Sequence, residues 1–230
     1  MVSPEVAAAV DSGMRSQLTR LHEFLAGGMP RAGWKVAFND PAVLARLGLD
    51  RSLVAPLDGR AILTSGGSWT LGAGVRARVE AEVAVRVGRD VAAGASLDEA
   101  RAAISALAPA IEIVDASRAS PDLAAMLADG VLHAATVFGH EVAFPASVPA
   151  GYPRLSIDGA VTREIIEGRV PADLAEIVVL VASTLGRYGE SLRAGDRIIC
   201  GSFIDPPDVA GGQHVLADFG AMGSVEVTFA

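Results

Sequence analysis

Apolar residues recur at the spacing of one helix face over residues 4–26, and Gly27 and Gly28 end this stretch. A different period follows further along the chain. Every second residue from 79 to 87 is small or apolar, which is the period of a strand with one buried face. Residues 33–38 and 223–229 alternate in the same way. The pattern therefore predicts an amphipathic N-terminal helix followed by mixed strands and helices.

Turn signals divide the rest of the chain. Asp158 and Gly159 favour a two-stranded turn, and the glycine-rich residues 65–74 favour hairpin turns that lead into the strand at 78–87. We expect one domain, because no internal repeat or linker interrupts the pattern; residues 1–60 would form an N-terminal helical cap with a lead-in strand, and residues 61–230 one compact unit. The remaining expected elements are helices over residues 41–47, 96–107, 123–135 and 171–185, and a strand at 197–200 followed by a loop.

Composition narrows the choice of partners. The chain has 230 residues, a net charge of -8 and a pI near 5.0, so neither nucleic acid nor an anionic membrane would attract it. The mean hydropathy of +0.40 is high, which favours a homo-oligomer that buries surface between subunits. No leader segment or membrane-spanning run is evident, and we expect a cytoplasmic protein. Cys200 is the only cysteine, so no internal disulfide is expected, and its apolar context favours a buried strand position.

Glu80 and Glu82 are the first candidate functional residues. They are two positions apart in the alternating strand, so their side chains point to the same face. Two like charges this close require a wet face or a cation between them. Both interpretations stay open at this point, and so does a purely structural acidic patch without metal.

Glu112 strengthens the metal hypothesis because it interrupts the apolar run 109–115. A carboxylate rarely enters such a strand unless it is paired or binds a metal. An ion pair with one of the many arginines is the alternative. Three carboxylates from two strands would form the all-oxygen site that Mg2+ or Mn2+ prefers.

Lys35 is the single lysine in a chain with eighteen arginines. An ammonium is a compact donor whose pKa burial can lower, whereas a guanidinium stays protonated. The lysine is therefore a candidate for chemistry that arginine cannot perform, although chance retention is the alternative.

Five stretches carry a resemblance when they are taken together: Gly33-Trp34-Lys35-Val36 and residues 78–84, 110–115, 192–203 and 217–225. They resemble the 2-keto-4-pentenoate hydratase and 4-oxalocrotonate decarboxylase group of the fumarylacetoacetate hydrolase superfamily. The resemblance implies an α+β fold, a mixed β-roll with flanking helices and an N-terminal helical cap. It also implies a bound Mg2+ or Mn2+ whose ligands would be Glu80, Glu82 and Glu112.

The resemblance further implies a lyase, hydratase-like, that acts on a small 2-oxo (2-hydroxydienoic) acid through a metal-stabilised enolate in the breakdown of aromatic compounds. Lys35 matches the family's active-site lysine, and Asp58 lies near its acidic partner, although Asp58 is also a good turn residue. Ser202 and Leu132 fall on substrate-binding positions. Association with a decarboxylase of the same pathway would be consistent with this group.

Two departures from the group concern the substrate wall. Residues 129–133 read Asp-Gly-Val-Leu-His where many hydratases resemble Asp-Asn-Ala-Ser-Ser, and Ile204 replaces a threonine. These changes remove hydroxyls, so the usual hydroxypentadienoate is not the expected substrate, and His133 becomes a candidate replacement acid or base. The alternatives are a 2-oxo acid decarboxylase, an acylpyruvate-type C-C hydrolase, or a non-catalytic metal-stabilised scaffold or partner subunit.

Overall fold

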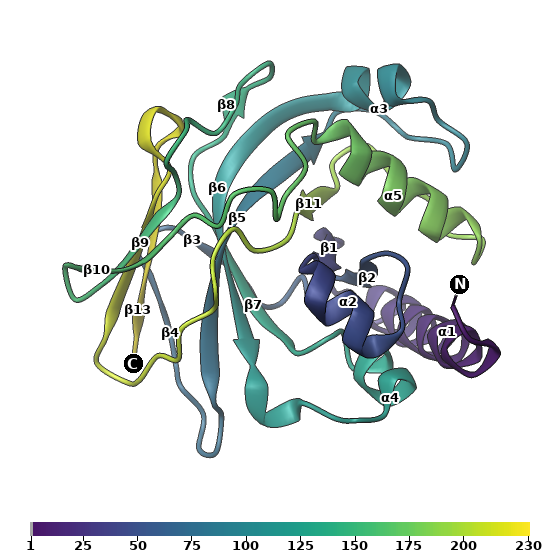
Figure 1. Cartoon of the computed structure of the whole chain (residues 1–230), viewed down its shortest axis with the longest axis horizontal. Coiled ribbons are helices and arrows are strands. Elements are labelled where there is room, and N and C mark those ends of the chain that lie inside the picture. The colour runs from purple at the N-terminus through teal and green to yellow at the C-terminus, as the bar shows by residue number, and fades with distance from the viewer. Residues whose placement is uncertain (1) are drawn as a thin grey trace.

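The computed structural model describes residues 2–230 and contains two β-sheets with helices on one side (Figure 1). Helix α1 begins where the Ser3 hydroxyl accepts a hydrogen bond from the Val6 amide, and it buries Met14, Leu18 and Leu21, as its apolar spacing predicted. The helices are α1 (Pro4–Ala26), α2 (Pro41–Leu47), α3 (Leu97–Ala103), α4 (Leu123–Ala128) and α5 (Ala175–Gly186), with short 3-10 turns at Ala116–Arg118 and Gly220–Met222.

The larger sheet has eight strands in the order β2-β1-β11-β5-β6-β7-β3, with β8 paired to β6. Its pairs are antiparallel except β1 with β11 and β3 with β7. The strands are β1 (Gly33–Ala37), β2 (Leu53–Pro56), β3 (Ile62–Thr64), β5 (Ala77–Val87), β6 (Ile104–Asp115), β7 (His133–Phe138), β8 (Val142–Ala143) and β11 (Arg197–Ile199).

The smaller sheet has five strands in the order β10-β9-β12-β13-β4. Its members are β4 (Gly67–Trp69), β9 (Arg154–Ile157), β10 (Ala160–Glu164), β12 (His214–Asp218) and β13 (Ser224–Phe229). Apolar residues of β12 and β13 share the main core with one face of β5, which presents Val79, Ala81, Val83, Val85 and Val87. One face of the larger sheet therefore packs on the smaller sheet.

The larger sheet is rolled, so that its other face becomes an interior. Lys35 on β1 and Glu112 on β6 are separated by two strands, which in a flat sheet places their backbones about 14 Å apart. Their side chains nevertheless meet, with 2.5 Å between Lys35 Nζ and Glu112 Oε1. A second apolar cluster includes Phe138 of β7, Ile199 of β11 and Leu57, which follows β2. The mixed β-roll is thereby confirmed.

Two predicted helices end earlier than their patterns indicated. The helix expected over 96–107 stops at Ala103, because β-branched Ile104 is extended and begins the twelve-residue strand β6. The helix expected over 123–135 stops at Ala128, and His133 opens strand β7 instead. Gly130 has a φ of 77°, which ends the helical path.

Other differences follow from long-range pairing. Strand β12 was predicted as loop, and it forms because it lies between β9 and β13. Strand β4 lies within the glycine-rich residues 65–74 and pairs with β13 rather than with β5, so the hairpin expected to lead into the strand at 78–87 does not form. Helix α5 begins at Ala175 rather than at residue 171. The two-stranded turn at Asp158 and Gly159 joins β9 to β10 as predicted.

The chain buries most of its own apolar surface. Among residues 2–230, the large hydrophobic side chains that stay exposed are Leu97 and Val161. No helix in this range combines the length and apolarity needed to cross a membrane. The division at residue 60 stays a prediction; β1 and β2 pair within the same sheet as the strands that follow them.

Candidate metal centre and active site

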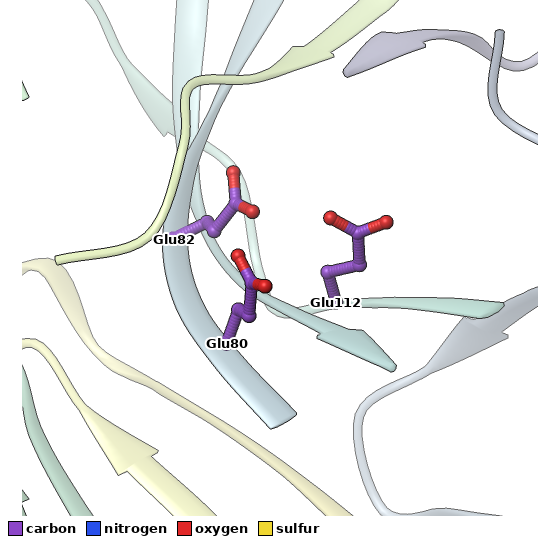
Figure 2. Close-up of side chains that lie close together, drawn as sticks. All are labelled: Glu80, Glu82 and Glu112. Atoms are coloured by element: carbon purple, nitrogen blue, oxygen red, sulfur yellow. The ribbon is translucent and has the colours of Figure 1, made fainter. Parts of the chain in front are cut away.

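Three carboxylates converge on the inner face of the rolled sheet (Figure 2). Glu80 and Glu82 project from β5 on the same side, and Glu112 projects from β6, where it is the direct cross-strand partner of Glu80. One oxygen from each lies within 4.8 Å of the others. The sequence predicted this group, and the antiparallel register of β5 and β6 assembles it.

Burial excludes the solvated-face interpretation for two of the three glutamates. Glu82 is 0% exposed and Glu112 is 1% exposed. Glu82 Oε2 accepts a 2.6 Å hydrogen bond from the Gly201 amide, but within residues 2–230 Glu82 Oε1 and Glu112 Oε2 have no hydrogen-bond partner. Unpaired buried carboxylate oxygens are costly. The donor set and its unused oxygens therefore fit a hard divalent cation.

The surroundings of the three glutamates shift their pKa values in different directions. Burial, with the nearby charge of Glu112, raises the pKa of Glu80 to about 7, and burial raises the pKa of Glu82 well above its ordinary value. Burial acts in the same direction on Glu112, but the charge of Lys35 and the hydrogen bond from His133 outweigh it and lower the pKa of Glu112. Glu112 is thus the carboxylate that the protein itself keeps ionised.

Lys35 lies inside the roll and is 3% exposed. Its ammonium donates to Glu112 Oε1 at 2.5 Å and to the Val131 carbonyl at 3.1 Å. The ion pair considered for Glu112 therefore exists, with the lysine rather than an arginine, and it occupies only one of the two carboxylate oxygens. The other oxygen stays available to a metal.

His133 is brought to the centre by a strained turn. Gly130, Val131 and Leu132 have consecutive φ values of 77°, 51° and 65°, which is costly for a β-branched residue such as Val131. The turn directs the Val131 carbonyl to Lys35 and places His133 Nδ1 2.8 Å from Glu112 Oε1. Because an ionised carboxylate accepts, Nδ1 carries a proton, and in the neutral imidazole Nε2 is then an acceptor; this buried atom has no partner among residues 2–230.

Thr136 is a residue of this face that the sequence interpretation missed. It is the cross-strand partner of Glu112 on β7, is 0% exposed, and its hydroxyl has no hydrogen-bond partner. The signal was a lone polar residue in an apolar stretch. It could not be assigned to a face while that stretch was interpreted as a helix.

The other predicted site residues have different surroundings. Asp58 does not pair with Lys35; its carboxylate accepts from Arg60 at 2.7 Å, and this hydrogen bond lowers the pKa of Asp58. The Ser202 hydroxyl donates to the Ile204 carbonyl at 2.9 Å within a turn. Leu132 is half-buried in the left-handed turn beside His133. Their catalytic and substrate-binding roles stay predictions.

Comparison with known proteins agrees with this architecture. The family model described as fumarylacetoacetate (FAA) hydrolase C-terminal matches residues 49–230. The chain therefore belongs to this family, as its motifs suggested.

Two characterised relatives are similar in sequence. A 4-oxalocrotonate decarboxylase of a Pseudomonas species is 25% identical over 203 residues, covering 86% of this chain and 78% of the relative. A 2-hydroxyhexa-2,4-dienoate hydratase of Comamonas testosteroni is 28% identical over 161 residues, covering 67% of this chain and 61% of the hydratase. The chain spans less than two thirds of the hydratase.

The fold is shared with a solved structure. The 4-oxalocrotonate decarboxylase from Pseudomonas putida G7, complexed with magnesium and adipate, superposes with a TM-score of 0.87 at 21% identity. The match covers 98% of this chain and 86% of that one.

The stability of the metal-free protein should decrease as the pH rises. The raised pKa values of Glu80 and Glu82 mean that the folded state favours their protonated forms. The contribution of Glu80 is complete below pH 4.5 and is lost as the pH passes through about 7, and that of Glu82 is lost in the same direction as the pH rises. Urea unfolding with a chelator should show a loss on the order of 2 kcal/mol across this range. The loss should shrink in Glu80→Gln, and an equal loss in that variant would contradict the assignment.

Thr136→Val should stabilise the metal-free protein by about 1 kcal/mol, because the change replaces an unpaired buried hydroxyl with a methyl group of the same shape. Thr136→Ser is the matched control, since it keeps the hydroxyl, removes the methyl and should destabilise by about 1 kcal/mol. Thermal or urea unfolding measures both. Destabilisation by the valine variant would mean that the hydroxyl has a partner inside the protein.

Proposed function

We propose that this chain is a divalent-metal-dependent lyase that acts on a small 2-oxo (2-hydroxydienoic) acid, with Glu80, Glu82 and Glu112 as ligands of Mg2+ or Mn2+. The observation that carries the proposal is the pair of buried, unpartnered carboxylate oxygens on Glu82 and Glu112, next to the third carboxylate and to Lys35. The named relatives, a decarboxylase and a hydratase, act on acids of this kind.

A bound cation would supply Lewis-acid stabilisation to the negative charge that develops on the C2 oxygen of a 2-oxo acid. Lys35 contributes a second positive charge from the opposite wall of the roll. Because its ammonium already donates to Glu112 and to the Val131 carbonyl, its position is fixed before substrate binds. Such preorganised charge costs little reorganisation during the reaction.

His133 is the proposed proton carrier. Glu112 holds the proton of the imidazole on Nδ1, so Nε2 can accept a proton from a substrate carbon or from water and return it. Glu112 would also stabilise the imidazolium that forms. The same carboxylate thus orients the base with one oxygen and offers the other oxygen to the metal.

Hydration, decarboxylation and C-C hydrolysis all develop negative charge on the C2 oxygen, so the charges of the site do not distinguish these reactions. Analysis of the products does. We expect the metal-loaded protein to hydrate a 2-hydroxydienoate without releasing carbon dioxide. Incubation with 2-hydroxypenta-2,4-dienoate, 4-oxalocrotonate and acetylpyruvate, followed by chromatography and carbon dioxide detection, tests this expectation. Carbon dioxide from oxalocrotonate would favour the decarboxylase, and pyruvate from acetylpyruvate the hydrolase.

Calorimetric titration of the chelated protein tests the metal centre. We expect Mg2+ and Mn2+ to bind with one site per chain, oxalate to tighten the binding, and Glu82→Gln to weaken it at least about 100-fold, since one of three charged ligands is lost. Glu176→Gln, at an exposed helix position, is the control and should bind as the wild type does. Absence of binding at millimolar metal would contradict the proposal and favour a purely structural acidic patch without metal.

Self-association remains part of the proposal, although its compositional support is weaker than the sequence suggested. The apolar residues that raise the mean hydropathy lie largely in the chain's own core. Light scattering would measure the assembly. Association with a pathway decarboxylase is a separate expectation that co-purification would test.

A further inference from the structure

A cavity of about 330 Å³ has His133 in its wall. Its walls come from α1, from the segment between β2 and β3, and from the end of α4. His133 contacts both the carboxylate group and the cavity, because its Nδ1 is hydrogen-bonded to Glu112 and its side chain lines the cavity. Leu57 also lines the cavity and packs in the second apolar cluster. The cavity therefore adjoins the candidate metal centre.

Much of the cavity wall is apolar and includes Leu21, Phe24, Met29 and Trp69. Its charged residues are balanced, with three arginines and three aspartates. Arg60 pairs with Asp58 at 2.7 Å, and both Arg20 and Arg118 pair with Asp129. No guanidinium of this wall is left without a carboxylate partner.

Two residues that line the cavity, Gln17 and His133, each carry one buried polar atom that has no partner among residues 2–230. Gln17 is 2% exposed; its Nε2 donates to the Val54 carbonyl at 2.8 Å, which fixes the amide and leaves Oε1 unpaired. The other atom is His133 Nε2. An acceptor attracts a hydroxyl or a water molecule and repels a carboxylate.

We infer that this cavity receives the distal chain of the substrate and that this chain is uncharged. The inference rests on the proposed function, which places the 2-oxo acid end at the three glutamates. A chain that passes His133 would meet apolar walls and guanidiniums that already have carboxylate partners. The substrate class is then a monocarboxylic 2-oxo or 2-hydroxydienoic acid with an apolar or hydroxylated tail, rather than a dicarboxylic acid.

Three 2-oxo acids with the same head test the inference by calorimetry on the Mn2+-loaded protein. Pyruvate has no tail, 2-oxohexanoate has an uncharged tail, and 2-oxoadipate has the same length with a distal carboxylate. We expect 2-oxohexanoate to bind at least about ten-fold more tightly than either of the others, because its three additional carbons leave water. Equal or tighter binding of 2-oxoadipate would overturn the inference.

Ala128→Leu narrows the cavity from the end of α4. This variant should bind 2-oxohexanoate no more tightly than pyruvate, with pyruvate binding unchanged. Ala125→Leu, on the same helix at an exposed position, should keep the preference. Retention of the preference in Ala128→Leu would place the tail elsewhere. Failure of Mn2+ and pyruvate to bind would overturn the proposed function and the inference together, whereas failure of the chain-length preference alone overturns only the inference.

Discussion

The structure depends on how three neighbouring carboxyl groups are tolerated on one face of a sheet. Glu80 and Glu112 are directly opposed across the β5–β6 ladder, an arrangement that repels, and Glu82 is fully buried beside them. Lys35 is the ammonium bonded to this group, and it reaches the group because the sheet is rolled. The roll and the charge group therefore require each other, and the remaining charge is left for a cation.

The strained turn before β7 belongs to the same compensation. Left-handed φ values at Val131 and Leu132 are unfavourable, but they allow one turn to supply both a carbonyl to Lys35 and an imidazole to Glu112. A regular helix through residue 135 would supply neither. The hydrogen bonds offset the unfavourable backbone conformation, because a hydrogen bond in a buried interior is stronger than one at the surface.

The sequence predicted what depends on local periodicity. Alternation assigned Glu80 and Glu82 to one face, and the apolar context of Glu112 marked it as unusual. The partner of Lys35 could not be predicted, because the contact joins residues 77 positions apart through the curvature of the sheet. Thr136 and the strand position of His133 were missed because an apolar stretch of this length fits a helix and a strand equally well, and pairing with β6 decides between them.

The position of Lys35 has a practical consequence. Apart from the terminal amine, it is the only amine in a chain of 230 residues, and it is 3% exposed inside the roll. An acylating reagent reaches it only when the interior opens to solvent, as entry of a substrate also requires. Lys35 is thus a native side-chain reporter, and the rate of its modification measures how often the interior opens under native conditions.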